Sequence, residues 1–226
     1  MDDYRFDKLH YLPELVDFSS FRGKQLLEVG CGLGIDLVRF AQAGAQVTGV
    51  DLSATAIELA CKNFANNDLK ATLQVMDGEA LGFEDRSFDA VYAHGVLQYS
   101  ADAGQMINEI YRVLKPAGEA ILMVYNKHSW LSALSRISKV ELEHQDAPAF
   151  RTYSEREFKS LLQAFEHVHI VPERFPVRTR LHRGLKAKLF NVMFVGGFNL
   201  LPYSVVRPLG WHLMAFALKS QSSNTT

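Results

Sequence analysis

The sequence has few cysteines, no surplus of charge of either sign and no long apolar run. Its two cysteines, Cys31 and Cys61, are too few for a disulfide framework and lack metal-ligand spacing, so we expect no metal and a reducing, cytoplasmic compartment. Lys and Arg number 24 against 25 Asp and Glu, and the net charge of −1 favours neither nucleic acid nor an anionic membrane as a partner.

The longest apolar stretch, residues 189–201, contains two asparagines and is shorter than the roughly 18 residues of a membrane-spanning helix. The first residues, MDDYRFDKLHYL, lack the apolar core of a secretory signal, so we expect none.

The residues that are present fit a single α/β domain. With 226 residues, 48% of them hydrophobic, the chain is long enough to bury a sizeable core. Strand-like and helix-like segments alternate, which predicts a mostly parallel sheet covered by helices on both faces. We expect strands at 25–29, 46–50, 71–75, 88–93, 120–125, 167–171 and 212–218, with helices at 54–66 after Ser53, at 101–114, and after a capping box of Ser154 and Glu157.

The run LLEVGCGLG at residues 26–34 is the most informative stretch. An apolar strand ends at Glu28 and is followed by three glycines spaced two apart, whose backbone can adopt positive φ and approach a ligand closely. A site for a nucleotide diphosphate usually has the pattern G-x-G-x-x-G, in which the third glycine comes one residue later. The spacing therefore favours a ligand without phosphates over a nicotinamide dinucleotide.

Two more predicted strands end in carboxylates. Residues 45–50 lead to Asp51, an acid that suits ribose hydroxyls, and residues 71–75 lead to the Asp-Gly-Glu turn at 77–79, where an adenine amino group and ring nitrogen could be bound. These ends are expected at one edge of the sheet, which predicts a nucleoside site there.

From about Lys24 to Tyr125 the chain resembles the class I S-adenosylmethionine-dependent methyltransferases, in particular their UbiE-like bacterial small-molecule branch. The resemblance rests on LLEVGCGLGIDLVRFAQAGAQVTGVDLS, on the turn at 77–79, on FDAVYAHGVLQYS and on EIYRVLKPAGEAILMVYNKHS. It implies a Rossmann-like sheet of seven strands with the last antiparallel, S-adenosyl-L-methionine as cofactor, and methyl transfer to an O, N or C atom of a small, partly apolar metabolite. Two departures are KPAG where the family usually has KPGG, and Gln98-Tyr99 where it often has HH.

The resemblance also implies the cofactor residues. Glu28, Gly30 and Gly32, with Cys31 between the glycines, would contact the methionine part, and Asp51 would bind the ribose. The adenine would meet Leu52, the Asp77 carboxylate and the Gly78 to Glu79 backbone, while Ala93 and His94 would border cofactor and substrate. Cys31 is expected to be a packing residue rather than a nucleophile, because no base is indicated near it.

His94 and Tyr99 are the candidate catalytic residues. A histidine at the carboxyl end of a strand can accept a proton near neutral pH, although it could equally serve only as a hydrogen-bonding group. Positioning alone could suffice for transfer from an activated methyl donor. We expect the substrate to be bound by Tyr11, Gln98, Tyr99, Tyr125 and His128.

The segments outside the core are expected to cover the site. Residues 1–23 would form an N-terminal lid or pack on the sheet, residues 24–174 the core, residues 211–219 the final strand, and residues 220–226 a disordered tail. The insertion at 175–210 is basic and then apolar; it could cover an amphiphilic substrate or touch a membrane through 185–205, or it could be a packed helical hairpin or a homodimer face.

Several functions remain as alternatives. The chain could be a non-catalytic cofactor-binding subunit of a biosynthetic complex, or an NAD-dependent oxidoreductase, which the glycine spacing disfavours. No Asn-Pro-Pro-aromatic motif follows the fourth predicted strand, where Ala93-His94-Gly95-Val96 stands, so methylation of a nucleobase amine is not expected. Either a monomer or a homodimer is compatible with the sequence.

Overall fold

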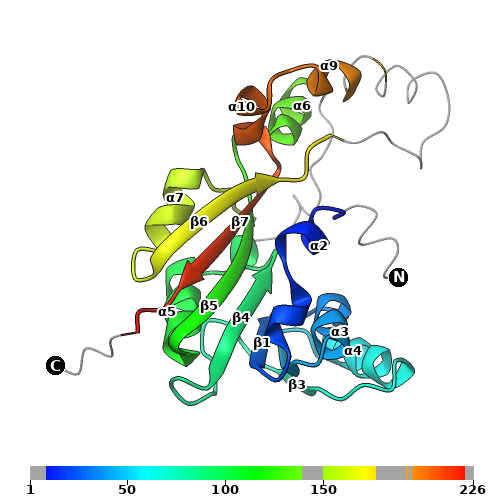
Figure 1. The fold of residues 1–226 in the computed structure, drawn as a ribbon, viewed down its shortest axis with the longest axis vertical. Helices are drawn as coiled ribbons and strands as arrows, with labels where there is room; N and C mark the ends of the chain where they lie inside the picture. The colour runs from blue at the N-terminus through cyan, green and yellow to red at the C-terminus, as the bar shows by residue number, and fades with distance from the viewer. Residues whose placement is uncertain (1–8, 139–149, 177–191, 193–194, 222–226) are drawn as a thin grey trace.

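A seven-stranded sheet in the order β3-β2-β1-β4-β5-β7-β6 forms the centre of the computed structural model, which describes residues 9–138, 150–176, 192 and 195–221 (Figure 1). Strands β1 to β5 run parallel, and β7 runs antiparallel to both β5 and β6. The predicted seven-stranded sheet with an antiparallel last strand is confirmed. The strands are β1 (Gln25–Val29), β2 (Gln46–Asp51), β3 (Thr72–Val75), β4 (Phe88–His94), β5 (Leu114–Tyr125), β6 (Glu166–Glu173) and β7 (His212–Leu218).

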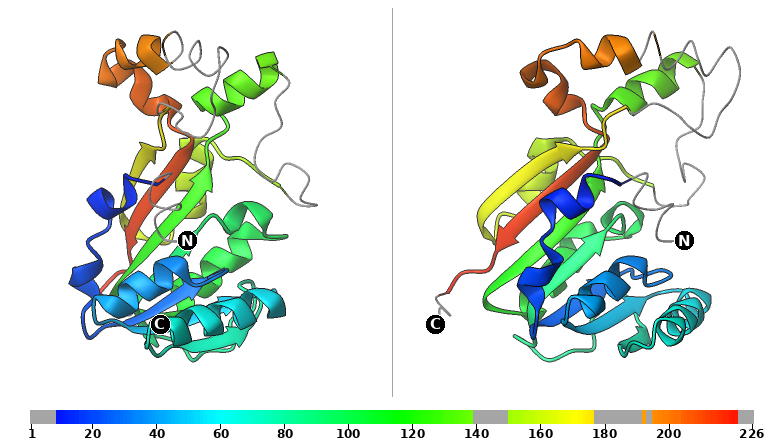
Figure 2. Two further views of the ribbon diagram at one scale, coloured as in Figure 1. Left: turned by 90° about the vertical axis from the view of Figure 1, so that its right-hand side faces the viewer. Right: turned by 45° about the vertical axis from the view of Figure 1, so that its right-hand side comes forward.

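Helices cover both faces of the sheet (Figure 2). One apolar core lies between the sheet and α2, α3 and α4, and the other lies between the sheet and α5 and α7. The short helices α9 and α10 gather with α6 beyond the end of β5 (Figure 1). The helices are α2 (Leu12–Leu15), η1 (Phe18–Phe21), α3 (Ile35–Gln42), α4 (Ala54–Asn66), η2 (Leu97–Tyr99), α5 (Ala103–Val113), α6 (Trp130–Ser138), α7 (Glu155–Leu161), α9 (Gly196–Asn199), α10 (Tyr203–Val206) and η4 (Arg207–Leu209).

Local capping explains where two helices begin. The Ser53 hydroxyl accepts the N–H of Ala56 at 3.2 Å, and α4 spans the predicted residues. The predicted capping box is present at the start of α7, where Ser154 and Glu157 bond each other's backbone N–H groups. These caps satisfy N–H groups that have no partner within their helix.

Several predicted boundaries were wrong; strand β6, for example, spans Glu166–Glu173 rather than 167–171. Helix α5 begins at Ala103 rather than 101, because the side chain of Asp102 caps it by accepting from Gln105 N. Strand β5 begins at Leu114 rather than 120, because the turn that was expected to separate helix from strand is a bulge within β5, in which Ala117 has φ 60°.

The segment before β1 packs on the α3 side of the sheet. Tyr11, Leu12 and Phe21 are buried, and the Phe18 ring lies 4.6 Å from the Phe40 ring of α3. Packing on the sheet is therefore the observed arrangement for residues 9–21, while residues 1–8 lie outside the described residues. The lid stays a prediction.

Only part of the insertion at 175–210 falls in the described residues. Val195 and Val206 are buried, whereas Leu200, Leu201, Tyr203 and Val205 are exposed. The expected basic cluster at 178–188 lies outside the described residues. Within the part of the chain that is described, no helix is long and apolar enough to cross a membrane.

Candidate functional site

The glycine loop after β1 is held against the end of β2. The N–H groups of Gly30 and Cys31 donate to the Val50 carbonyl at 2.7 and 3.0 Å, and Gly32 N donates to Asp51 Oδ2 at 2.9 Å. All three loop glycines have positive φ, with values of 69°, 52° and 69° for Gly30, Gly32 and Gly34. The loop thus takes the conformation that the glycines were predicted to permit.

Three carboxylates lie at or just beyond the ends of three adjacent strands. Glu28 is buried in β1, Asp51 ends β2, and Asp77 follows β3. The two oxygens of Asp51 accept from Gly32 N and from Ser53 N, each at 2.9 Å, and a carboxylate still has acceptor capacity for two hydroxyls. Because β3, β2 and β1 are neighbours, these acids form one polar edge beside the glycine loop.

Cys31 is buried within this polar edge. Burial raises the pKa of its thiol well above the usual value, and the negative charges of Glu28 and Asp51 raise that pKa further. The thiol stays protonated at neutral pH, which fits a packing residue and not a nucleophile.

The turn after β3 has two different carboxylates. Asp77 Oδ1 accepts from Glu79 N at 2.9 Å, which fixes the turn itself. The Glu79 side chain points to another element, because its Oε1 accepts from Ser100 Oγ at 2.8 Å and from Ala101 N at 2.7 Å. The hydrogen bond from Ser100 lowers the pKa of Glu79, so this carboxylate is ionised and ties the turn to the start of α5.

Three further residues expected to contact the cofactor, Gly78, Leu52 and Ala93, differ in how far they are buried. Gly78 is required by packing, since a Cβ there would lie 2.7 Å from Val29 Cγ1. The Leu52 side chain is 74% exposed beside Asp51, and Ala93 is buried on the α5 side of the core.

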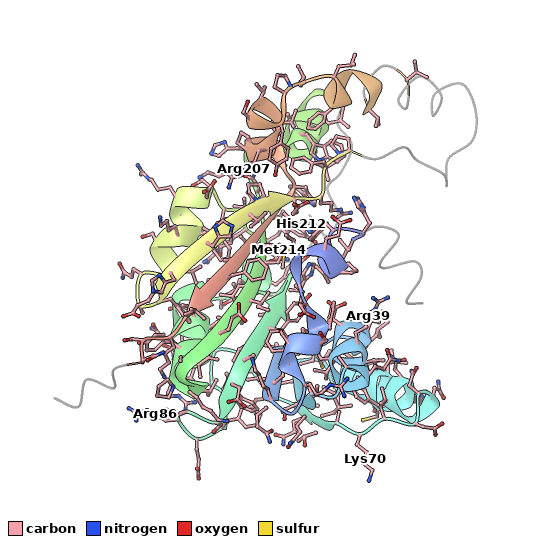
Figure 3. All side chains as sticks on the ribbon, viewed as in Figure 1. Arg39, Lys70, Arg86, Arg207, His212 and Met214 are labelled. Carbon is pink, nitrogen blue, oxygen red and sulfur yellow. The ribbon has the colours of Figure 1, made fainter. Side chains whose placement is uncertain are left out.

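His94, at the end of β4, belongs to a cluster that spans the chain from α2 to β7. The Tyr11 hydroxyl lies 3.3 Å from His94 Nε2 and 2.5 Å from His212 Nδ1, and the Arg174 guanidinium lies 3.0 Å from His212 Nε2. His212 opens β7, next to the end of β6 and near α2 (Figure 3). The fold therefore gives the predicted residues His94 and Tyr11 two partners that the sequence analysis missed.

An aromatic wall, formed by Tyr99, Phe150, Tyr125 and Trp211, lies beside this cluster. The Phe150 ring lies 6.0 Å from Tyr99 and 5.7 Å from Tyr125, and Tyr125 stacks on Trp211 at 4.6 Å. Tyr125 is also 5.5 Å from the His212 ring, so the wall and the cluster share a border. Trp211 and Tyr125 are buried, so a flat or apolar ligand would meet this wall at Tyr99 and Phe150, which are partly exposed.

His128 is the predicted substrate residue that the fold does not bring to this site. It is exposed in the turn before α6, where its backbone N–H donates to Asn126 Oδ1 at 2.9 Å. Within the described residues, no hydrogen bond or ring contact joins its side chain to the cluster.

Gln98 is fully buried in η2, and its side-chain amide has no hydrogen-bond partner among the described residues for either Nε2 or Oε1. Nε2 lies near Gly95, since a Cβ built there would be 3.3 Å from it. A buried amide without partners is costly, and this position next to Tyr99 suits a group that binds a ligand.

We expect Gln98→Met to stabilise the protein by about 1–3 kcal/mol, because it removes a desolvated amide while keeping similar volume. Urea unfolding measures the change. Gln42→Met, at an exposed position of α3, is the control and should stay within about 0.5 kcal/mol of the parent chain. A loss of stability in Gln98→Met would show that the amide is satisfied in solution and would remove its assignment as a ligand-binding group.

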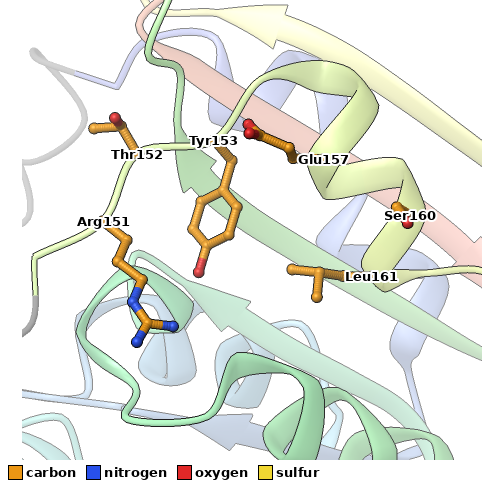
Figure 4. Close-up of a pocket in the computed structure, with 6 residues that line it drawn as sticks. All are labelled: Arg151, Thr152, Tyr153, Glu157, Ser160 and Leu161. Atoms are coloured by element: carbon orange, nitrogen blue, oxygen red, sulfur yellow. The ribbon is translucent and has the colours of Figure 1, made fainter.

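A separate surface groove lies between residues 151–153 and α7 (Figure 4). None of the strand-end residues predicted to bind a cofactor lines it. Its lining residues are Arg151, Thr152, Tyr153, Glu157, Ser160 and Leu161.

Comparison with known proteins agrees with this geometry. Residues 27–122 match the family model of a methyltransferase domain. The chain is similar to a sterol 4-C-methyltransferase of Caenorhabditis elegans, with 35% identity over 98 residues (42% of this chain and 29% of that protein). It is also similar to a ubiquinone biosynthesis O-methyltransferase of Bartonella tribocorum, with 31% identity over 119 residues (53% of this chain and 48% of that protein). The chain thus spans half or less of the length of these curated relatives.

Solved structures share the fold over nearly the whole chain. Magnesium protoporphyrin IX methyltransferase from Synechocystis, solved with bound SAH, has a TM-score of 0.64 at 18% identity, covering 97% of this chain and 83% of that one. The YcgJ protein of Bacillus has a TM-score of 0.65 at 17% identity, covering 95% of this chain and 100% of that one. Because both identities are below 20%, the comparison shows that the fold is shared and nothing more.

Proposed function

Because the chain belongs by its domain and fold to the class I S-adenosylmethionine-dependent methyltransferases, we propose that it transfers a methyl group to an O, N or C atom of a small, partly apolar metabolite. The observation that carries the proposal is the polar edge formed by Glu28, Asp51 and Asp77 around a glycine loop, directly beside the His94 cluster and the aromatic wall. One part suits a nucleoside and the other an acceptor.

The residues of the polar edge fit S-adenosylmethionine. Asp51 would accept hydrogen bonds from the ribose hydroxyls, and the exposed Leu52 would cover the adenine, whose amino group would donate to Asp77. The open backbone of Gly30 and Gly32 would lie along the methionine part, with Glu28 beneath it. When bound, the cofactor supplies a methyl group whose sulfur leaving group is already activated by positive charge.

The chain's own residues then have two tasks. The aromatic wall and Gln98 would orient the acceptor, and correct orientation alone can supply about 7–11 kcal/mol of the barrier. His94 would accept the proton of a hydroxyl or amine acceptor, a contribution of typically about 10²–10⁴ in rate. A carbon or oxygen acceptor needs this proton transfer more than an uncharged amine does.

The insertion and the cysteines support further proposals about the acceptor and the location of the protein. A partly amphiphilic acceptor is supported by the exposed Leu200, Tyr203 and Val205 near α6, and a membrane contact through 185–205 stays a prediction, since most of that range lies outside the described residues. The two free cysteines support a reducing, cytoplasmic location. We expect a monomer or a homodimer.

Calorimetric titration with S-adenosylmethionine, S-adenosylhomocysteine and NADH tests the proposal. We expect micromolar binding of the first two and none of NADH. Binding of NADH alone would favour the oxidoreductase alternative, and binding of the first two without turnover across a panel of hydroxyl, amine and carbon acceptors would favour a non-catalytic subunit.

We expect Asp51→Asn to weaken S-adenosylhomocysteine binding by about 10- to 150-fold, because it removes a charged acceptor worth about 1.5–3 kcal/mol while keeping one oxygen for the loop. The control is Glu58→Gln on the exposed side of α4, which should leave the affinity unchanged. Equal affinities in the two variants would remove Asp51 from the ribose site.

A further inference from the structure

The charges of this chain are divided unevenly along its length. Residues 174–226, the basic part, contain eight Lys and Arg and neither Asp nor Glu. Residues 1–173, the acidic body, contain 16 Lys and Arg against 25 Asp and Glu. The net charge of −1 is therefore the sum of −9 in the acidic body and +8 in the basic part. A division of this kind indicates that one part of a chain meets an anionic partner.

The basic part also has most of the exposed apolar side chains. Nine large apolar side chains are exposed in the described part of the chain, and five of them lie between residues 192 and 205. Four of these five lie at the end of α9, in α10 or between the two helices, and we refer to them as the α9–α10 surface. They are Leu200, Leu201, Tyr203 and Val205, each between 48% and 86% exposed. Apolar side chains gathered in this way mark a site where another surface binds.

Contacts within the fold hold the α9–α10 surface in place. Val195 and Val206 are buried and attach the two helices to the rest of the molecule. The ring of Phe175, which follows the end of β6, lies 6.3 Å from the Phe198 ring and 6.3 Å from the Tyr203 ring. Both helices lie at one end of the molecule, and α3 and α4 lie at the other (Figures 1 and 2). The exposed apolar side chains are therefore presented at one tip of the fold.

Cations are attached at the same tip. Arg207 directly follows α10 and is exposed (Figure 3). Five more Lys and Arg lie in the sequence between Phe175 and Phe198. Because the rings of Phe175 and Phe198 lie 6.3 Å apart, the stretch that carries these five cations starts and ends at the α9–α10 surface. An anionic partner drawn by the basic part would meet the exposed apolar side chains there.

The chemistry of the α9–α10 surface favours a lipid bilayer over two other partners. Three of its four side chains are aliphatic, which suits acyl chains, whereas single-stranded nucleic acid is bound by stacking of bases on aromatic rings. A symmetric dimer formed through this surface would bring two basic parts together, because the same patch occurs on both sides of a twofold axis. Contact with the acidic body of a second copy would join unlike surfaces and build rings or filaments.

We propose that the α9–α10 surface docks on anionic lipid bilayers. Its four apolar side chains enter the boundary between head groups and acyl chains, and the basic part is attracted to the head groups. Head groups of negative charge repel the acidic body, so the molecule binds in one orientation, with the tip formed by α9 and α10 toward the bilayer. Docking requires neither cofactor nor methyl acceptor and therefore goes beyond the proposed function.

Co-sedimentation of the full chain with vesicles, without cofactor, tests the proposal. Vesicles of phosphatidylglycerol and phosphatidylcholine in equal parts should bind the chain at about 0.05 M salt, and vesicles of phosphatidylcholine alone should bind it at least about tenfold more weakly. Raising the salt to about 0.5 M should weaken binding to the anionic vesicles by about tenfold or more, because the charges are then screened. Absence of binding to the anionic vesicles at low salt, or equal binding to both kinds of vesicle, would overturn the proposal.

A double variant tests the apolar side chains. Leu200→Ser combined with Val205→Ser should weaken binding to the anionic vesicles by about tenfold or more, because two aliphatic side chains no longer enter the bilayer. The matched control is Leu59→Ser on α4, at the other end of the molecule, where the side chain is also exposed and the binding should not change. Equal binding by the double variant and the control would refute the role of the α9–α10 surface.

A second pair of variants tests the charge. Arg207→Gln should weaken binding at low salt by about fivefold, the usual effect of one basic residue near an anionic bilayer, and the effect should fade at high salt. Lys62→Gln, which removes an exposed cation from α4, should leave the binding unchanged. An effect of Lys62→Gln as large as that of Arg207→Gln would mean that the chain has no preferred orientation on the bilayer, contrary to the proposal.

The same variants identify the other partners. Self-association of the parent chain that the double variant abolishes, measured by sedimentation velocity without vesicles, would assign the α9–α10 surface to a second copy and overturn the proposal. Binding of oligodeoxythymidine in preference to the anionic vesicles would overturn it in favour of nucleic acid. Circular dichroism and S-adenosylhomocysteine affinity of the double variant, both expected to be unchanged, show that it is folded. The affinity for S-adenosylhomocysteine thus tests the methyltransferase assignment separately from docking.

Discussion

Gly30→Ala is expected to abolish S-adenosylhomocysteine binding at micromolar concentrations. The new methyl group would lie 2.2 Å from Val96 Cγ2, and the residue would still have to adopt φ 69°. Overpacking and a left-handed backbone each cost about 1–3 kcal/mol, so the loop would leave the conformation in which Gly32 N reaches Asp51. Calorimetric titration and thermal unfolding measure the two consequences.

Two other glycines of this chain separate the causes. Gly23 also has a positive φ, of 74°, but no atom of the part of the chain that is described lies within 4 Å of a Cβ built there, so Gly23→Ala measures the backbone cost outside the site. In Gly32→Ala the new methyl group meets no atom of the described residues within 4 Å. Any affinity that this variant loses beyond the backbone cost therefore reports contact with the ligand. If Gly30→Ala bound as well as Gly23→Ala, the loop would not be part of the cofactor site.

Trp211→Ala is expected to lower the free energy of unfolding by about 3–5 kcal/mol, the usual cost of removing a fully buried large aromatic side chain. The Trp211 side chain is 0% exposed and stacks on Tyr125 with an interplanar angle of 12°. For a chain of this size the loss corresponds to a decrease in Tm of about 6–20 °C. Denaturant unfolding gives the free energy and calorimetry gives Tm.

A conservative variant shows whether the ring or its N–H matters. The Trp211 Nε1–H is buried without a hydrogen-bond partner in the described part of the chain, so Trp211→Phe should keep the stacking and lose much less stability than Trp211→Ala. Leu200→Ala, at a side chain that is 86% exposed, should stay within about 0.5 kcal/mol. A Trp211→Ala effect as small as that of Leu200→Ala would mean that the aromatic wall is not a packed unit.

The cofactor edge could be predicted from the sequence because its determinants are local. The glycines follow Glu28 within six residues, and Asp51 ends the strand that comes next along the chain. The structure confirms the strands, the sheet and the positive φ values of the loop glycines. The residues' contacts with a cofactor stay predictions.

The partners of His94 could not be predicted because they depend on the order of the strands. Tyr11 and His212 are 201 positions apart, and they meet only because β7 lies between β5 and β6 and runs antiparallel to both. The one local sign of His212 is a histidine at the start of the otherwise apolar strand HLMAFAL. Phe150 follows residues outside any predicted element, so its place between Tyr99 and Tyr125 had no pattern to reveal it.

The position of β7 also sets an order for folding during synthesis. Strand β6 is made well before β7, and its only partner in the described sheet is β7. A nascent chain on the ribosome can therefore assemble β1 to β5 as a parallel unit, but it exposes the free edge of β5 until β7 is made. Between the synthesis of β5 and of β7 the chain therefore has an unpaired strand edge, a feature that promotes aggregation.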